Sequence, residues 1–360
     1  MIKRRQTRQV QVGGVRVGGN APISVQSMLT TDTRDVEGSL NEITRLAEAG
    51  CDIIRLAVPD AEASAALKEI CLHSPIPVVA DIHYDYRLAL AAIRAGANAI
   101  RINPGNMRDE EGIREVATLA RRRSVPIRVG VNSGSISKEV RNLYDGVNAQ
   151  SLAYTALEAC KALENYDFED ICVSAKASSP LMMIETYRML SDHFDYPLHL
   201  GVTEAGTVNE GTIRSTIGIG SLLLDGIGDT IRVSLTADPI QEVKVGISIL
   251  RSLSLRDEGV RLISCPTCGR TEVDLMNMAQ ELEAKLAPIK APLTVALMGC
   301  SVNGPGEARE ADVGLAGGRG FFFLFKKGDI IAKLSQKDAI PALMAEIDKL
   351  LEESEQSNGI

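Results

Sequence analysis

Three cysteines in the last hundred residues of this 360-residue chain have a spacing that suits metal or cluster binding. Cys265 and Cys268 stand in the run Cys-Pro-Thr-Cys-Gly, and Cys300 begins a glycine-rich run that ends at Glu307. A structural zinc site needs four Cys or His ligands, but the four histidines of the chain all precede this region. A [4Fe–4S] cluster fits better, because three thiolates can bind three irons and leave the fourth to the oxygen of Glu307. Zinc with a fourth ligand from elsewhere is the alternative.

A second set of chemically suggestive residues lies in a repeated Ile-Arg-apolar unit. Four short apolar runs that are typical of strands carry an arginine each, and a fifth ends in a lysine; these residues are Arg55, Arg101, Arg128, Arg232 and Lys176. Guanidinium groups bind phosphate oxygens in a bidentate way, and an ammonium adds a point charge. Five cations in one confined site would need an anion beside them. They predict an anionic ligand, and a diphosphate suits them better than a single carboxylate.

The elements that must position these residues are eight short apolar runs, with helix-like segments between them. The expected strands cover residues 23–28, 53–58, 78–83, 100–103, 127–132, 171–176, 198–203 and 231–236. The expected helices cover residues 40–49, 61–71, 88–95, 111–122, 151–164 and 181–193. Eight such units predict an α/β fold, a (β/α)8 TIM barrel. An open doubly wound sheet is the competitor, but it usually has about five to seven strands.

Side-chain alternation along these strands predicts which face lines the barrel. One phase is apolar, with residues such as Ile54 and Leu56, as expected under a layer of helices. The other phase is polar on every strand, although both faces of an open parallel sheet are normally apolar. We therefore expect the polar phase to face inward, with a site at the C-terminal mouth. Its candidate substrate-binding residues are Arg55, Asp81, Arg101, Asn103, Arg128, Asn132, Lys176, His199, Arg232 and Ser234.

Few acidic side chains balance these cations. Asp81 is the one expected inside the barrel, and Glu204 is expected at its rim. Asp81 and His83 can handle protons or simply orient an arginine, and the residues leave both roles open. If the arginines instead pointed outward to helix acids, the Ile and Val phase would have to fill the barrel. Residues 9–18 alternate valines about Gly13-Gly14 and predict a hairpin that caps the barrel floor.

The pattern changes near residue 255. Short strands are expected at 260–264, 293–297, 313–315, 321–325 and 330–334, with helices at 272–285 and 338–351. They predict a small α+β domain with its cysteines where strands pass into loops. We therefore expect a substrate-binding barrel domain over residues 1–255 and an iron–sulfur domain over residues 256–360.

Composition excludes several classes of protein. Hydrophobic residues make up 45% and charged residues 24%, which excludes a disordered chain. The net charge of −8 argues against a nucleic-acid-binding coat. No run reaches the roughly 18 uncharged apolar residues that a membrane helix needs, so we expect no membrane association and a cytoplasmic protein. The seven cysteines do not suggest a disulfide framework, and we expect the four outside the cluster motif to be core thiols.

Longer stretches resemble the 4-hydroxy-3-methylbut-2-enyl diphosphate synthases, the GcpE/IspG family of the non-mevalonate isoprenoid pathway. These stretches cover residues 22–28, 80–84, 101–106, 130–135, 176–178, 199–206, 265–270 and 299–307. They extend over nearly the whole chain, and as a set they are highly specific. The chain resembles the short bacterial form, because it lacks the extra domain that some relatives carry between the barrel and the cluster module.

The resemblance implies an activity and roles for these residues. The activity is the two-electron reductive ring opening and dehydroxylation of 2-C-methyl-D-erythritol 2,4-cyclodiphosphate, with flavodoxin or ferredoxin as electron donor. It implies a [4Fe–4S] cluster on Cys265, Cys268, Cys300 and Glu307, with Glu307 displaced by substrate, and a catalytic proton from Glu204. The positions that hold the diphosphate match Arg55, Arg101, Arg128, Lys176, Arg232 and Ser234, with Asn132 and His199 beside them. It also implies a head-to-tail homodimer, in which one chain's cluster domain closes the other's barrel.

Two rival functions remain compatible with the residues. One is a zinc-stabilised barrel that performs aldolase or pterin-type transferase chemistry without electron transfer. The other is a non-catalytic redox sensor that uses the cluster to control a partner. A protein with stoichiometric zinc and no broad absorption near about 400 nm would favour the first. A response that survives substitution of Glu204 would favour the second.

Overall fold

The chain divides into two compact units, Met1–Arg256 and Asp257–Ile360. The computed structural model describes residues 2–103, 107, 109–300 and 310–358. Each unit has its own hydrophobic core.

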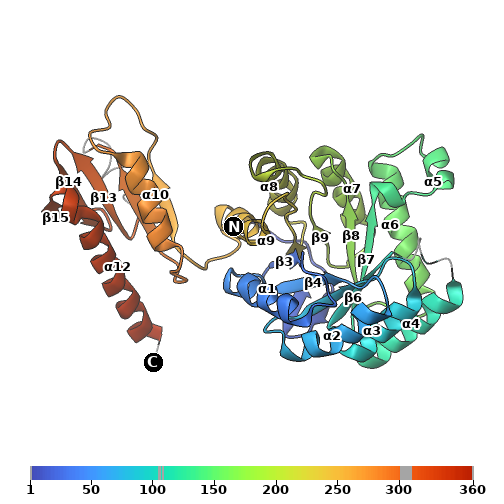
Figure 1. Cartoon of the computed structure of the whole chain (residues 1–360). Coiled ribbons are helices and arrows are strands. Elements are labelled where there is room, and N and C mark those ends of the chain that lie inside the picture. The colour runs from blue at the N-terminus through green and yellow to red at the C-terminus, as the bar shows by residue number, and fades with distance from the viewer. Residues whose placement is uncertain (1, 104–106, 108, 301–309, 359–360) are drawn as a thin grey trace. The chain divides into compact units, whose positions relative to one another are not determined.

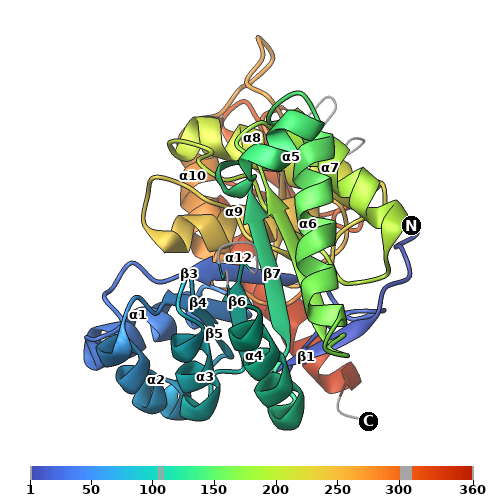
Figure 2. The same cartoon turned by 90° about the vertical axis from the view of Figure 1, so that its right-hand side faces the viewer.

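The first unit is built on a sheet of eight parallel strands that closes on itself (Figures 1 and 2). The strands pair in chain order and β10 returns to pair with β3, while a bridge from Val173 to Leu198 joins β8 to the start of β9. This confirms the predicted TIM barrel. The strands are β3 (Ser24–Met28), β4 (Ile53–Ala57), β5 (Val78–Asp81), β6 (Ala99–Ile102), β7 (Ile127–Asn132), β8 (Ile171–Lys176), β9 (His199–Leu200) and β10 (Thr230–Ile231).

Helices surround the strands (Figure 1). Six match the predicted segments: α1 (Val36–Glu48), α2 (Ala61–His73), α3 (Tyr86–Ala95), α4 (Glu110–Arg123), α6 (Ala149–Glu164) and α7 (Pro180–His193). The first four each follow an aspartate whose carboxylate accepts a hydrogen bond from a backbone N–H of the first turn, which fixes where the helix begins. The sequence pattern did not predict three others, α5 (Lys138–Leu143), α8 (Val208–Leu224) and α9 (Pro239–Ser252).

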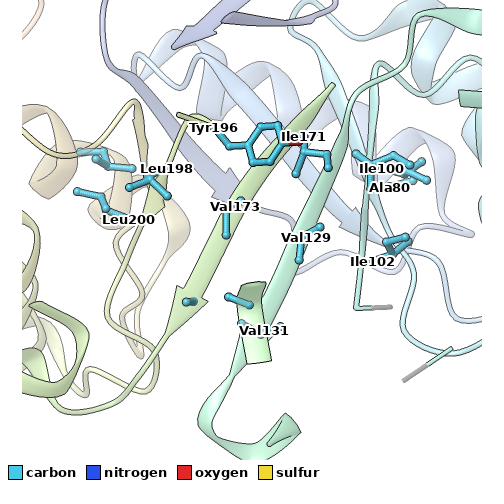
Figure 3. Close-up of a cluster of buried hydrophobic side chains, with 14 of the residues drawn as sticks. Ala80, Ile100, Ile102, Val129, Val131, Ile171, Val173, Tyr196, Leu198 and Leu200 are labelled. Atoms are coloured by element: carbon cyan, nitrogen blue, oxygen red, sulfur yellow. The ribbon is translucent and has the colours of Figure 1, made fainter. Parts of the chain in front are cut away.

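The barrel core confirms the predicted alternation of strand side chains. Residues of the apolar phase, such as Ile100, Val129 and Val173, lie in the main hydrophobic cluster between strands and helices (Figure 3). The hairpin of β1 (Gln9–Val12) and β2 (Val15–Gly18) is also confirmed. Its valines pack against inward-facing residues at the start of the barrel strands, namely Ile53, Val79, Ala99 and Cys172. The floor is therefore apolar, and the polar inward residues lie above it.

The second unit is a five-stranded mixed sheet with two helices on one face. Its strands are β11 (Arg261–Ser264), β12 (Thr294–Met298), β13 (Val313–Gly318), β14 (Phe321–Lys326) and β15 (Asp329–Leu334), in that spatial order. Strands β11, β12 and β13 pair in parallel, whereas β14 pairs antiparallel with both of its neighbours, β13 and β15. Apolar residues of α10 (Leu275–Leu286) and α12 (Gln336–Asn358) form one core with the sheet. No helix among the described residues of either unit is long and apolar enough to span a membrane.

Candidate active site

A cavity of about 230 Å³ opens at the C-terminal ends of the barrel strands. Parallel strands present these ends on one side of a barrel, which is where barrel enzymes hold their substrates. Residues from each of the eight strands, or from the loops that follow them, line the cavity: Met28, Arg55, Asp81, His83, Arg101, Val131, Asn132, Ser174, Lys176, Thr203 and Arg232. Six of the ten predicted substrate-binding residues are in this lining.

Asp81 neutralises two of the lining arginines. Its carboxylate accepts a hydrogen bond from Arg101 Nη1 at 3.1 Å and lies 3.5 Å from Arg55 Nε. Burial opposes the ionised form of this carboxyl, but the charges of Arg55 and Arg101 outweigh it and lower the pKa of Asp81. The imidazole Nε2 of His83 lies 3.7 Å from the same carboxylate and is half exposed. Asp81 is therefore an ionised anchor for the cations.

Arg232 has a carboxylate partner that the sequence pattern missed. Glu242, in the first turns of α9, is buried, and its Oε2 lies 3.5 Å from Arg232 Nη2. The strand pattern predicted Asp81 as the one acidic group inside the barrel. The structure adds Glu242, which lies close to a second part of the cation cluster. Asp238 and Pro239 mark the start of α9 with an N-cap and an N1 proline, and this signal could have revealed the helix.

Arg128 lies deeper in the barrel, in contact with polar side chains above the floor. Its Nη1 lies 3.1 Å from His199 Nδ1 and donates to Gln26 Oε1 at 3.2 Å. Burial first, and then the charges of Arg128 and Lys176, lower the pKa of His199 well below its ordinary value. The neutral ring can accept a hydrogen bond from Arg128. Burial, with the charge of Arg101, also lowers the pKa of Arg128 to about 10.

Lys176 is the most exceptional cation of the site. Its side chain is buried, and Nζ has no hydrogen-bond partner in the part of the chain that the structure describes. Nε and Nη2 of Arg128 are likewise without partners there. Burial, reinforced by the charges of Arg232 and Arg55, lowers the pKa of Lys176 well below its ordinary value. A buried donor without a partner is costly, so an anion that accepts these hydrogen bonds would be bound strongly.

Two glycines make room for the cations. A Cβ atom on Gly130 would lie 2.2 Å from Arg101 Nε, and one on Gly201 would lie 2.9 Å from Lys176 Nζ. The carbonyl oxygen of Gly130 also accepts a hydrogen bond from Arg101 Nη2 at 2.9 Å. Both glycines stand in the motifs 130–135 and 199–206. The motifs therefore contribute the space that the long cationic side chains need, in addition to polar groups.

The other predicted barrel residues lie around the cavity. Asn132 lines it at the end of β7 and is exposed, whereas Asn103, just after β6, is buried outside the described lining. Ser234 follows β10 in a loop, because that strand ends at Ile231, three residues before it. Glu204 is exposed in the loop after β9 and has a φ of 54°. A non-glycine residue in this left-handed region is strained, and such strain is typical of functional loops.

The three cysteines of the second unit lie on two loops that are joined by hydrogen bonds. Cys265 and Cys300 follow the neighbouring parallel strands β11 and β12, and the Gly299 amide donates to Cys265 Sγ at 3.1 Å. The Cys268 amide donates to Thr271 Oγ1, and the Glu272 amide donates to the Gly299 carbonyl at 3.0 Å. Hydrogen bonds from the backbone and side chain of Arg270 lower the pKa of Cys268. Thiolate character and an N–H···S bond both suit an iron–sulfur cluster.

The described part of the cysteine loops contains three of the four predicted ligands. Glu307, the predicted fourth ligand, lies outside the described residues. Within the described ranges, no three His, Cys, Asp or Glu side chains are close enough together to hold one metal ion. The donor types and the shared sheet edge fit a cluster. The other four cysteines lie in the barrel unit, where burial raises the pKa of Cys51, Cys71 and Cys172 to about 12.

Family models and individual proteins match both units of the chain. A GcpE TIM-barrel domain matches residues 7–247, and a GcpE protein C-terminal domain matches residues 261–349. A protein of Ruminiclostridium cellulolyticum named 4-hydroxy-3-methylbut-2-en-1-yl diphosphate synthase (flavodoxin) is 53% identical, over 97% of this chain and 99% of its own. A protein of Caldanaerobacter subterraneus with the same name is also 53% identical, over 98% and 100%.

A solved structure of low identity matches part of the chain. It is the 3-dehydroquinate dehydratase of Geobacillus kaustophilus, with a TM-score of 0.50, 15% identity, and coverage of 69% of this chain and 99% of that one. At this identity the likeness supports the barrel fold and nothing about the reaction.

Proposed function

Because the chain belongs to the GcpE family, we propose that it is an oxidoreductase that makes 4-hydroxy-3-methylbut-2-enyl diphosphate. The substrate is 2-C-methyl-D-erythritol 2,4-cyclodiphosphate. Two electrons and two protons open the ring at a carbon–oxygen bond and release a hydroxyl as water, so that atoms and charge balance. The observation that carries the proposal is the barrel cavity, whose described lining brings together the four cationic side chains of Arg55, Arg101, Lys176 and Arg232 and the single carboxylate of Asp81.

Within the cavity, the described residues divide into binding and supporting roles. Lys176 has unsatisfied donor capacity, and we assign it, with Arg128, the strongest contacts to the diphosphate. Arg55 and Arg101 are held by Asp81, so they present guanidinium groups to the cavity in fixed orientations, and Arg232 lines the cavity beside them. Asn132, at the mouth, offers an amide to a hydroxyl or phosphate oxygen. His199 contacts Arg128, and Asn103 and Ser234 are proposed as further polar contacts of the substrate.

We assign proton delivery to a residue at the mouth of the barrel, Glu204. Glu204 follows β9 in a strained, exposed loop next to Thr203 of the cavity lining. We assign it the proton that leaves with the substrate hydroxyl as water. Asp81 is held ionised by two arginines and is therefore a poor acid, which favours Glu204 for this step.

A [4Fe–4S] cluster on Cys265, Cys268, Cys300 and Glu307 completes the proposed enzyme. When bound, such a cluster supplies single electrons and an open iron coordination position. The N–H···S contact at Cys265 and the lowered pKa of Cys268 support thiolate ligands at these loops. The names of these relatives include flavodoxin, which supports flavodoxin rather than ferredoxin as electron donor. We also propose the head-to-tail homodimer that the family resemblance implies.

Anaerobic purification followed by turnover tests this function. Reconstituted protein should contain about four irons per chain, absorb broadly near about 400 nm and convert the cyclic diphosphate when a chemical reductant is added. Glu204→Gln should retain the absorption and lose turnover. A colourless protein with stoichiometric zinc would instead support the aldolase or transferase alternative. A coloured protein that never converts the cyclic diphosphate would support the redox sensor.

A further inference from the structure

Glu242 is a buried carboxylate beside the cavity to which the proposed reaction assigns no role. Its Oε2 lies 3.5 Å from Arg232 Nη2 and accepts a hydrogen bond from Ser27 Oγ at 3.2 Å. Its Oε1 accepts a hydrogen bond from the Leu235 amide at 2.8 Å. One carboxylate thus connects β3, the loop after β10 and the side chain of a cavity-lining arginine.

The support behind this carboxylate is rigid. Glu242 belongs to α9, whose Val243 and Leu250 are fully buried in the main barrel core. Its own exposed fraction is 4%. A side chain that is anchored at its backbone and accepts hydrogen bonds at both oxygens has little freedom to move. The position of the negative charge is therefore fixed by the fold and does not depend on a ligand.

The arginine it contacts is only partly satisfied. Nη2 of Arg232 lies against Glu242, whereas Nε has no hydrogen-bond partner among the residues that the structure describes. Arg232 lines the same cavity as Lys176. An unrestrained arginine would populate many rotamers and would lose that freedom on binding. A fixed carboxylate at one edge removes most of this freedom before the ligand arrives, which is how preorganised sites gain affinity.

We propose that Glu242 is a positioning residue, which holds the Arg232 guanidinium in the orientation that meets the diphosphate. This inference rests on the proposed function, because it takes the cyclic diphosphate as the ligand of Arg232. Two other roles for Glu242 predict different results. A purely structural carboxylate would act through Ser27 and Leu235 without regard to Arg232. A simple counter-ion would compete with the ligand for the charge of Arg232.

Binding of the cyclic diphosphate to the oxidised holoenzyme separates these roles, because no turnover occurs without a reductant. Glu242→Gln is nearly isosteric and removes the charge. If Glu242 positions Arg232, the dissociation constant measured by calorimetry rises about tenfold or more, although the site has lost a negative charge. If Glu242 only competes with the ligand, the same variant binds more tightly, and that result would overturn the proposal.

A double-mutant cycle with Arg232→Ala tests whether the effect passes through the arginine. Once Arg232 is absent, Glu242→Gln should weaken binding no further. Additive losses would assign Glu242 a structural role and contradict the proposal. Should Glu242→Gln fail to fold, Glu242→Asp retains the charge but shortens the side chain by one methylene. Glu242→Asp should weaken binding when Arg232 is present and leave binding unchanged in the Arg232→Ala variant.

Glu42→Gln is the matched control. Glu42 is also a buried helix carboxylate, on α1, and it accepts hydrogen bonds from Thr30 and Thr31 without contact to a cavity arginine. This variant should lower the melting temperature and leave the dissociation constant within about twofold of wild type. If Arg232→Ala itself binds normally, the proposed function of the site is wrong. If Arg232→Ala binds weakly and Glu242→Gln binds normally, only the positioning role is wrong.

Discussion

Asp81 and Arg101 stand opposite each other on the neighbouring strands β5 and β6, and Arg101 Nη1 donates to Asp81 Oδ1 at 3.1 Å. The same carboxylate lies 3.5 Å from Arg55 Nε on the strand to the other side. One buried anion thus serves guanidinium groups of both adjacent strands. The partnerless nitrogens of Lys176 and Arg128 receive no such compensation among the described residues.

Asp81→Asn should destabilise the barrel and make it depend on its ligand. Removing one partner of a buried ion pair costs about 3–5 kcal/mol, because the remaining charges stay buried. The melting temperature should fall by several degrees, and inorganic pyrophosphate should restore more of it than it adds to wild type. Asp238→Asn is the control, since it breaks the exposed pair with Arg45, which is worth about 0–1 kcal/mol. Equal effects of the two substitutions would argue against the role given to Asp81.

Lys176→Met should stabilise the ligand-free protein while it weakens substrate binding. The variant removes a buried ammonium that lies among cations, and we expect a gain of about 1–3 kcal/mol in the free energy of unfolding at pH 7. The folded pKa of Lys176 is depressed, so the unfolded chain binds its proton more tightly. Wild type should therefore gain stability as pH rises toward the ordinary lysine value of about 10.4, and the advantage of the variant should shrink.

Chemical denaturation at pH 7 and pH 9.5 measures both effects for Lys176→Met. Lys326→Met is the matched control, because Lys326 Nζ lies 3.1 Å from a carboxylate oxygen of Glu346. It breaks a surface ion pair, so it should lose a little stability rather than gain any. A loss of stability in Lys176→Met at pH 7 would contradict the conclusion that the site carries excess positive charge.

His199 should make the stability of wild type fall in mild acid. Its folded pKa lies well below the ordinary value, chiefly because of burial and then Arg128, so the unfolded chain takes up the proton first. The contribution of the neutral ring is complete above about pH 7.5 and is lost as pH falls below about 6.5, by up to about 1.4 kcal/mol per pH unit. His199→Gln keeps an acceptor for Arg128 but cannot titrate. Urea denaturation between pH 8 and 5.5 should show the difference between the two proteins narrowing below pH 6.5 only.

Gly201→Ala should displace two site residues at once. The added methyl would lie 2.5 Å from the Arg232 carbonyl oxygen and 2.9 Å from Lys176 Nζ, and the backbone atom cannot simply rotate away. We expect weaker binding of the cyclic diphosphate by about tenfold and a lower melting temperature. Gly220→Ala in α8 is the control: its Cβ would meet no atom within 4 Å, and alanine should stabilise the helix by about 0.5–1 kcal/mol. Unchanged binding in Gly201→Ala would show that the lysine has more room than the structure indicates.

The barrel and most of its inward residues could be predicted because they follow a local rule. Along β4, β6, β7 and β8, strict alternation places Arg55, Arg101, Arg128 and Lys176 on the inner face. Alternation does not predict side-chain directions beyond the end of a short strand. Strand β10 ends at Ile231, so the positions of Ser234 and its neighbours depend on the conformation of a loop. Glu242 could not be predicted this way, since it reaches Arg232 from a helix through tertiary packing.

The proposed head-to-tail dimer predicts that two inactive variants restore each other. Arg232→Ala disables the barrel unit, and Cys268→Ser disables the cluster unit, so neither homodimer turns over substrate. In a mixed dimer, an arrangement that pairs one chain's barrel with the other's cluster creates one site in which both units are intact. Random pairing then gives about one quarter of wild-type activity.

Co-expression of the two variants with different affinity tags, followed by tandem purification, isolates the mixed dimer. Purified alone, it should turn over the cyclic diphosphate at about half the wild-type rate per dimer, because one of its two sites is intact. If each barrel instead works with the cluster of its own chain, every site of the mixed dimer contains one disabled unit, and activity stays at the background of the single variants. That outcome, or a protein that elutes as a monomer at assay concentration, would rule out the shared site and leave the proposed reaction itself untouched.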